Sequence, residues 1–467
     1  MKFFRMDISV LRGGISAGMI TAKQLTAEAF DRIAQLDSGE KGFHAVRALN
    51  PDAPFLASRL DERQGAGETT GPLHGIPILL KDNLSTADGL PTAAGAAALA
   101  DNFCTADAEA VRRLREAGAV ILGKTNMTEF ANYVSWTMPN GYSSLGGQVG
   151  SVFSGIDPSG SSTGSAVAVA MGYCPAAIGT ETCGSIIAPA IQAGIVGLKP
   201  TLGLCSRRGI LPISHTLDTP GPLTRSVRDA ALLLEVLAGH DPGDPATRLA
   251  QPPSFTAALT EDLSGLRVGI SRLFPEEAIP GQTEAASEAA KLLEKQGASC
   301  VRLKEETFSC NALFTIMRHE FHGDLERYLR DFGGSRLKTL DGIVRWNEAH
   351  AETALRYGQD ILLEALAAPE GYAAPEYLAA LADREAVIAR LTETFEANGV
   401  DIILILSGAL GHPALAGFPD LTLPLGRNKD GEPLSALLMA RPFREDQLLR
   451  TGYALEQALL HQRQARA

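Results

Sequence analysis

The chain has 467 residues, of which 45% are hydrophobic, so it can bury a large core and is expected to be globular. Its formal net charge of −12 at pH 7 would repel a polyanion, which argues against a nucleic-acid-binding protein and favours a small or neutral partner. No segment approaches the roughly 18 uncharged apolar residues that a membrane span requires. We therefore expect no membrane-embedded part.

The cysteines indicate a reducing compartment. Six of them lie scattered without CxxC pairs in a chain that is large enough to fold without disulfides. The opening MKFFRMDISVLRGG also lacks the apolar segment of a cleavable signal peptide. These features predict reduced thiols and a cytoplasmic protein.

Helices and strands alternate along the first third of the chain. Two helical segments are expected between Asp7 and Leu36, the second with Thr21 as its N-cap. HGIPILLKDN follows as a short apolar strand that ends at Lys81. An amphipathic helix, DAEAVRRLREAG, closes at Gly118 before the buried strand AVILG. This alternation predicts a layered α/β fold.

The rest of the chain continues this pattern with one long helical stretch. Residues from Gly141 to Gly164 are rich in glycine and serine and are expected to be loop, followed by a tightly packed helix, GSAVAVAMG. AAIGTETCGS is a predicted strand that runs into a glycine-serine turn. Residues 305–395 read as amphipathic helices broken only at PEGYAAPEY, and are interpreted as an insertion or cap. VDIILILS and FPDLTLPLG return to strand character before a last helix, EDQLLRTGYALEQALLHQR.

Three polar groups stand where apolar segments meet glycine-rich turns: Lys81, the pair Ser161 and Ser162, and Ser185. A serine hydroxyl is a poor nucleophile until a neighbouring base takes its proton, and a lysine can be that base only when neutral. Desolvation by surroundings such as IPILL would lower the lysine pKa in the required direction. A second serine could relay the proton, and turn amides could hold an oxyanion. Spacing alone does not choose among the serines.

Longer motifs narrow the choice. GIPILLKDN, SGSSTGSAVAVA, GTETCGSIIAPA, VGLKPT and DTPGPLTRSVRDAALLL, in this order and spacing, resemble the amidase signature family across roughly residues 65–235. GKTNMTEFA, NGYSSLGGQV, HEFHGDLERYL and FPDLTLPLG extend the resemblance over nearly the whole chain. The segments NGYSSLGGQV and GTETCGS are most similar in sequence to members of the branch that contains bacterial peptide amidases.

The resemblance implies one α/β domain over residues 1–467, with a mixed central β-sheet flanked by helices and a helical insertion or cap. Within it we expect a helical N-terminal lead-in (1–65), a catalytic core (66–304), the helical cap (305–395), and a return to the core sheet with a C-terminal helix (396–467).

The resemblance also implies a Ser-Ser-Lys triad. Lys81 matches the catalytic lysine, Ser161 matches a bridging serine that follows a cis peptide bond, and Ser185 matches the nucleophile. Thr182, Cys183, Gly184 and Ser185 match the oxyanion-hole segment.

Five positions depart from the commonest family pattern. Ser159 and Thr163 replace glycines, Glu181 replaces an aspartate, Cys183 replaces a glycine, and Ile187 stands where an arginine is frequent. These changes predict that an Asp–Arg ion pair beneath the turn is absent.

We therefore predict an amidase that hydrolyses a linear carboxamide, such as a peptide C-terminal amide, to a carboxylate and ammonia or an amine through an acyl-enzyme on Ser185. No metal or organic cofactor is expected, and the protein is predicted to be a monomer or homodimer. Substrate contacts are predicted at Ser135, Trp136, Met138 and Ser162. The alternatives are an ammonia-generating A-type component of a tRNA-dependent amidotransferase, which shares the triad, and a non-catalytic binding protein on the same fold.

Two glycine motifs suggest other chemistry but lie in the wrong context. GAVILGKT (Gly118–Thr125) satisfies the P-loop pattern, yet AVIL is itself the strand and a helix precedes it, so nucleotide binding is not expected. GSSTG satisfies the nucleophile-elbow pattern of an α/β-hydrolase with Ser162 at its centre, but the preceding FSGIDPS is loop where that elbow needs a strand.

Other side chains have simpler explanations than catalysis. His215 and Asp218 could complete a Ser–His–Asp set with Ser185, but a histidine in PISHTLDTPGP is more often structural. Cys183 is expected to act as a small apolar residue rather than as a thiolate. HEFH lacks the HExxH spacing of zinc sites and is expected to place two histidines on a surface helix face.

Overall fold

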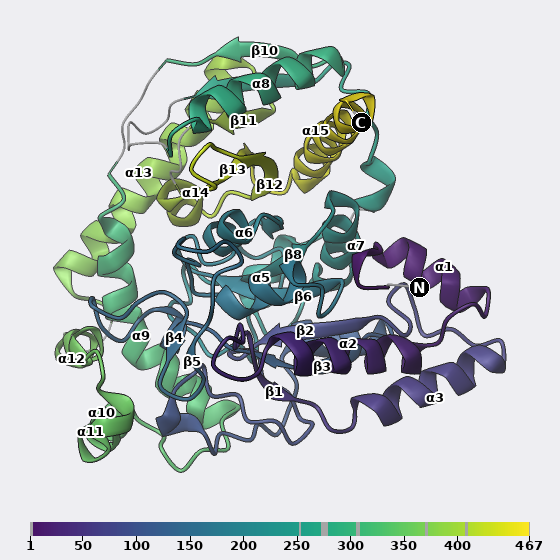
Figure 1. The fold of residues 1–467 in the computed structure, drawn as a ribbon. Helices are drawn as coiled ribbons and strands as arrows, with labels where there is room; N and C mark the ends of the chain where they lie inside the picture. Colours follow the sequence, from purple (N-terminus) through teal and green to yellow (C-terminus); the bar gives the residue numbers. More distant parts are fainter. Residues whose placement is uncertain are drawn as a thin grey trace.

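One mixed sheet runs through the computed structural model, which describes residues 3–251, 254–271, 279–304, 309–368, 372–406 and 410–466 (Figure 1). The pairs β2–β3 and β2–β6 are parallel, and β6–β8 is antiparallel. In sheet order the strands are β1 (Val46–Leu49), β3 (Val120–Thr125), β2 (Pro77–Lys81), β6 (Ala176–Glu181), β8 (Thr219–Thr224), β7 (Val196–Lys199), β12 (Asp420–Arg427), β13 (Pro433–Ala440), β11 (Ile402–Ile405), β9 (Arg267–Ser271) and β10 (Ser299–Arg302).

The parallel pairing of β2 with β6 matters most for function. Leu80 lies opposite Ile178, so both strands leave the sheet at the same edge. Lys81, the last residue of β2, is thereby brought beside the turn that follows β6.

Side chains alternate between two cores on opposite faces of the sheet. Ile78 and Leu80 belong to one core, whereas Leu79 belongs to the other, as expected for a strand buried on both faces. The first core includes α1 (Ile8–Ser16), α4 (Glu109–Glu116), α7 (Val227–Leu237), α8 (Gln282–Lys295) and α15 (Glu445–Arg466), and the second includes α2 (Ala22–Leu36), α3 (Ala53–Gly65), α5 (Thr163–Ala170) and α6 (Ile187–Ala193). Lys81 is in register with Leu79 and so faces α5.

A third core joins the remaining helices to the sheet at the side of the molecule that is on the left in Figure 1. Ile403 and Ile405 of β11 reach this core, whereas Ile402 and Leu404 reach the first one. The helices are α9 (Ala312–Asp331), α10 (Leu340–Ala349), α11 (Ala351–Ala354), α12 (Asp360–Ala367), α13 (Pro375–Asn398) and α14 (Gly411–Ala416). Most of them fall in the stretch predicted to be helical; residues 369–371 of the predicted break lie outside the described residues.

The predicted fold class, a mixed α/β sheet flanked by helices, is confirmed. The loop prediction between Gly141 and Gly164 is wrong in two places, because β4 (Tyr142–Ser143) and β5 (Gly147–Gln148) form a hairpin and α5 already begins at Thr163. The stretch predicted as a helical lead-in also contributes β1, which pairs with β3. The short 3-10 helices are η1 (Phe3–Arg5), η2 (Ala97–Leu99), η3 (Glu129–Ala131), η4 (Pro245–Leu249) and η5 (Thr256–Ala258).

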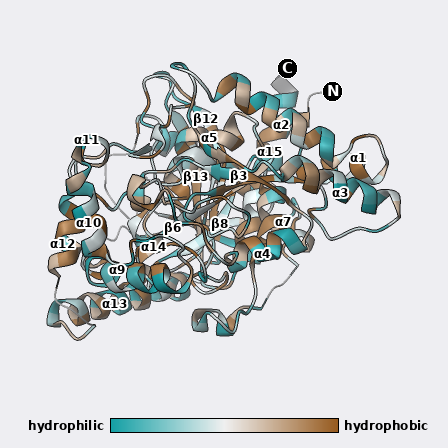
Figure 2. Cartoon of the chain, turned by 90° about the horizontal axis from the view of Figure 1, so that it is seen from below, coloured by the Kyte–Doolittle hydropathy of each residue, from teal (hydrophilic) through white to brown (hydrophobic). Residues whose placement is uncertain are grey.

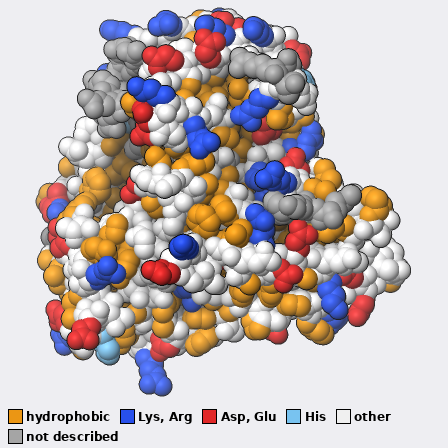
Figure 3. All heavy atoms as spheres, viewed as in Figure 1, with side chains coloured by type: hydrophobic (Ala, Val, Ile, Leu, Met, Phe, Trp, Pro, Cys, Tyr) orange, Lys and Arg blue, Asp and Glu red, His pale blue; other side chains and the backbone are white. Residues whose placement is uncertain are grey.

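Polar and apolar residues are distributed as in a protein built around buried strands. Hydrophobic residues gather in the centre of Figure 2, and the outer helices carry both kinds. On the face in Figure 3, acidic and basic side chains are interspersed. Among the described helices, none is both long and apolar enough to cross a membrane, and no disulfide joins the described cysteines.

We expect Thr21→Ala to lower the free energy of unfolding by about 1 kcal/mol. Thr21 Oγ1 accepts the Gln24 N–H at 3.1 Å and the Gln24 side chain accepts the Thr21 N–H at 2.9 Å, which confirms the predicted N-cap as a complete capping box. Urea unfolding would measure the loss. Thr69→Ala, at an exposed site before β2, is the control, and equal stability of the two variants would contradict the role of the cap.

Candidate active site

Lys81 is buried at the end of β2 with 0% of its surface exposed. Its Nζ donates to Ser161 Oγ at 2.8 Å and to the Thr180 carbonyl oxygen at 3.0 Å. Burial lowers the pKa of Lys81 to about 7, against the opposing effect of the negative charges on Asp218 and Glu181. A substantial share of the lysine is therefore neutral near pH 7, which is the form that can accept a proton.

The serine pair lies at the start of α5, above the sheet. The Gly160–Ser161 peptide bond is cis. The Ser162 N–H donates to the Ser185 carbonyl oxygen at 3.2 Å, so this bond ties the serine pair to the turn after β6. Ser162 Oγ donates to the Thr180 carbonyl oxygen at 3.1 Å. Ser162 is thus held within the protein, while Ser161 is held by Lys81.

A glycine in β6 makes room for this arrangement. A Cβ atom on Gly179 would lie 2.8 Å from Ser162 Oγ and 3.0 Å from Ser162 Cβ. These separations are shorter than side chains tolerate, so any larger residue at position 179 would push the serine pair away from the sheet.

Two carboxylates hold the turn that runs from Thr182 to Ser185. Glu181 Oε2 accepts the N–H groups of Ile186 at 2.7 Å and Ile187 at 3.1 Å, just beyond Ser185. At the other end, Asp218 Oδ1 accepts the Thr182 hydroxyl at 2.5 Å. The turn is therefore fixed on both sides of Gly184, which has a φ of +78° that favours glycine.

Asp218 is itself fixed by the backbone. Its Oδ2 accepts the N–H groups of Ile213 at 2.8 Å and Ser214 at 3.1 Å. Burial nevertheless raises the pKa of Asp218 to about 6. From the sequence, Asp218 is expected only as a possible partner of His215. The hydrogen bond between Asp218 and Thr182 is not predicted.

Three of the residues that depart from the commonest family pattern, Glu181, Cys183 and Ile187, have defined contacts or are buried. Glu181 caps the backbone after the turn rather than pairing with an arginine, and Ile187 is fully buried. Burial raises the pKa of the Cys183 thiol to about 12, so this thiol stays protonated at neutral pH.

A cavity of about 250 Å³ opens onto Ser185, which is 8% exposed. Of the four residues predicted to contact substrate, Ser135, Trp136 and Met138 line it, whereas Ser162 lies outside the described lining. Helices α9 and α12 contribute residues that the sequence did not single out, because their apolar side chains at helical spacing look like ordinary core. The described lining comprises Ala131, Asn132, Tyr133, Ser135, Trp136, Met138, Gly160, Thr182, Cys183, Ser185, Ile213, Phe314, Met317 and Ile361.

The side chains of the alternative motifs have other partners and positions than those motifs suggest. His215 Nδ1 lies 2.8 Å from Asp324 Oδ2 and lines a separate cavity of about 370 Å³, so its carboxylate partner is not Asp218. In the P-loop-like segment, Lys124 lies inside β3, fully buried, with its Nζ donating to Thr92 Oγ1 at 2.9 Å. The expectation of two surface histidines in HEFH is wrong for His319, which is buried beside the Tyr377 ring.

Comparisons with known proteins find relatives that match nearly the whole chain. The Amidase family matches residues 24–414. The native peptide amidase of Stenotrophomonas maltophilia is 37% identical, with a TM-score of 0.91 over 98% of both chains. A probable amidase of Arabidopsis thaliana is 34% identical over 97% of this chain and 90% of its own length. A component of the glutamyl-tRNA(Gln) amidotransferase of Lachnospira eligens is 35% identical over 96% of this chain and 97% of its own.

The fold and these relatives define a hydrolase that acts on carbon–nitrogen bonds in amides. The chain belongs to the Amidase family.

We expect Gly179→Ala to reduce amide hydrolysis by about a hundredfold, because displacing the serine pair by even about 1 Å misaligns it with Lys81. The overpacking should also cost about 1–3 kcal/mol of stability. Gly65→Ala, where a Cβ would meet nothing within 4 Å, is the matched control. Steady-state kinetics of both variants at a temperature where each is folded provide the test, and unchanged kcat/KM in Gly179→Ala would contradict the role of the glycine.

Proposed function

We propose that this protein hydrolyses linear carboxamides, peptide C-terminal amides among them, through an acyl-enzyme on Ser185. The observation that carries the proposal is the 2.8 Å contact between Lys81 Nζ and Ser161 Oγ, combined with the depressed lysine pKa. A neutral amine has one lone pair and two N–H groups. With one N–H donated to the Thr180 carbonyl, the lone pair can accept the proton of Ser161.

In the first step, Ser185 Oγ attacks the amide carbon while its proton passes to Ser161 and the Ser161 proton passes to Lys81. N–H groups of the turn from Thr182 to Ser185 hold the resulting oxyanion. The proton returns through Ser161 to the leaving nitrogen, and the C–N bond breaks to release ammonia or an amine. Water then attacks the acyl-enzyme, using the same relay, and releases the carboxylate.

The choice of substrate is supported by the character of the cavity. Each described lining residue is uncharged, so a neutral acyl group can enter without leaving a charge unpaired. A free glutamine carries an ammonium and a carboxylate, and both would need partners. This favours a peptide amide over glutamine, although components of glutamyl-tRNA(Gln) amidotransferases are among the relatives.

We also propose that residues 1–467 act as one domain, as a monomer or homodimer. The proposal is supported by a single sheet whose strands come from both ends of the chain, β1 (Val46–Leu49) and β13 (Pro433–Ala440) included. Release of ammonia from a peptide amide by the purified chain alone would support this proposal, and hydrolysis of glutamine only with a partner chain would favour the amidotransferase alternative.

We expect Ser185→Ala to abolish turnover and labelling by a fluorophosphonate probe while the thermal unfolding curve stays unchanged. Ser162→Ala is the matched control because Ser162 is the neighbouring buried serine and the centre of the GSSTG pattern; it should still be labelled at Ser185. Mass spectrometry of the labelled peptide identifies the site. Labelling at Ser162 in the wild type would overturn the assignment.

We expect the acid limb of the pH profile of kcat/KM to follow Lys81. The neutral, active form predominates above about pH 7, so activity should rise with pH through that value. Asp218→Asn removes a negative charge that favours the ammonium form, and should therefore move the acid limb to lower pH. Glu288→Gln, a charge change at an exposed site on α8 outside the described cavity lining, is the control. An acid limb at the same pH in Asp218→Asn would contradict the electrostatic coupling.

A further inference from the structure

Two large aromatic side chains stand exposed on the wall of the cavity that holds Ser185. Trp136 is 56% exposed and Phe314 is 52% exposed, and both line this cavity. Their ring centroids lie 5.5 Å apart at an interplanar angle of 59°. Exposed apolar surface at a concave site is the kind of surface that a ligand covers.

We infer that Trp136 and Phe314 form a subsite for a large apolar or aromatic side chain on the residue whose amide is cleaved. The inference rests on the proposed function and adds the class of acyl group. Ser185 lines the same cavity as this pair, and so do Met138, Met317 and Ile361, so apolar side chains share the cavity with the nucleophile.

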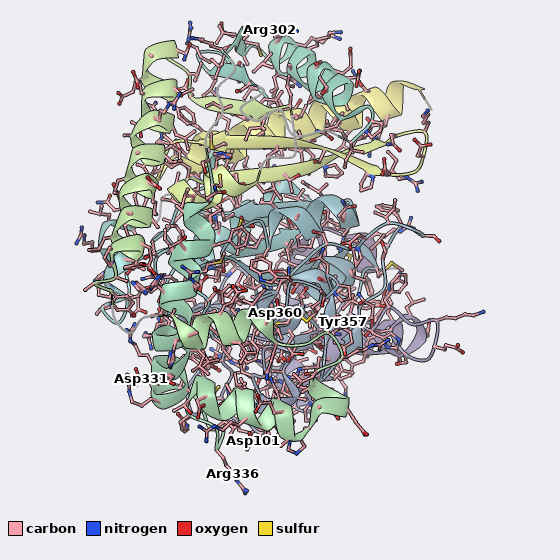
Figure 4. The ribbon with its side chains drawn as sticks, turned by 90° about the vertical axis from the view of Figure 1, so that its left-hand side faces the viewer. Asp101, Arg302, Asp331, Arg336, Tyr357 and Asp360 are labelled. Carbon is pink, nitrogen blue, oxygen red and sulfur yellow. The ribbon has the colours of Figure 1, made fainter. Side chains whose placement is uncertain are left out.

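The indole of Trp136 is fixed from behind by α12. Its Nε1–H donates to Glu364 Oε1 at 3.0 Å, and the Trp136 backbone N–H donates to Asp360 Oδ2 at 3.3 Å. The neighbouring Ser135 hydroxyl donates to the Tyr357 carbonyl oxygen at 2.6 Å. Figure 4 shows Tyr357 and Asp360 close together on this helical side. The polar N–H of the indole is thus already satisfied, which leaves its apolar surface for a substrate, and the ring needs little ordering when it binds.

The charges around the pair favour apolar over ionic side chains. The nearby carboxylates of Asp360 and Glu364 are engaged with Trp136, and each described lining residue is uncharged. A glutamate side chain entering the subsite would lose hydration and lie near these like charges, and a lysine side chain would compete with the N–H groups of Trp136 for the two carboxylates. A phenylalanine or leucine side chain would instead remove from water both its own apolar surface and that of the two aromatic rings.

The test is a series of N-acetyl amino-acid amides with glycine, alanine, leucine, phenylalanine, lysine and glutamate, assayed by ammonia release. In the wild type, kcat/KM for the leucine and phenylalanine amides should exceed that for the alanine amide by at least about tenfold. Trp136→Ala and Phe314→Ala should each bring the phenylalanine-to-alanine ratio close to one, because the loss of kcat/KM falls more heavily on the phenylalanine amide than on the glycine or alanine amide. Trp136→Phe should keep most of the preference.

Phe55→Ala is the matched control, since Phe55 is 62% exposed on α3, outside the described lining, and its loss should leave the ratio unchanged. A wild-type enzyme that hydrolyses these amides without preferring the apolar ones would overturn the subsite alone. An equal loss on all substrates in both alanine variants, with Trp136→Phe no better, would also overturn it. A wild-type protein that hydrolyses none of the amides would overturn the proposed function and the subsite together.

Discussion

The carbonyl oxygen of Thr180 is the acceptor around which the site is assembled. It accepts hydrogen bonds from Lys81 Nζ at 3.0 Å and from Ser162 Oγ at 3.1 Å. Because Thr180 is the penultimate residue of β6, its position is set by the parallel pairing with β2 and the antiparallel pairing with β8. The sheet therefore fixes the lysine and the serine pair relative to each other before any substrate binds, and such preorganisation lowers the cost of reaching a reactive geometry.

The sequence predicts the parts of the site better than their contacts. Lys81 at the end of a buried strand follows from IPILLK, because an apolar segment of that length is typical of a strand buried on both faces. Lys81 and Ser161 are 80 residues apart in the sequence, so the spacing of residues along the chain cannot reveal their contact. The resemblance to the family motifs predicted it. The role of Gly179 was also hidden, since a glycine in a strand has many explanations until the neighbouring atoms are known.

Residues that contribute through shape were the hardest to predict. Phe314, Met317 and Ile361 line the cavity, but they come from helices whose apolar pattern serves the third core as well. A hydrophobic residue at helical spacing is normally buried by its neighbours, so nothing in the sequence separates Phe314 from Ile316. Asp218 illustrates the opposite problem: a conspicuous acid near a histidine suggests a triad, yet the two side chains have different partners.

The buried lysine links the proposed chemistry to the stability of the fold. Its pKa falls from 10.5 to about 7 on folding, so between these values the unfolded chain binds the additional proton and stability rises with pH. Near pH 7 and below, the buried Lys81 therefore costs stability relative to higher pH. The negative charges of Asp218 and Glu181 favour the ammonium form of Lys81 and so limit this loss of stability. They also reduce the population of the neutral form, which is the base. The same two carboxylates fix the turn around Ser185. Removing either one would therefore change both the geometry of the turn and the basicity of Lys81.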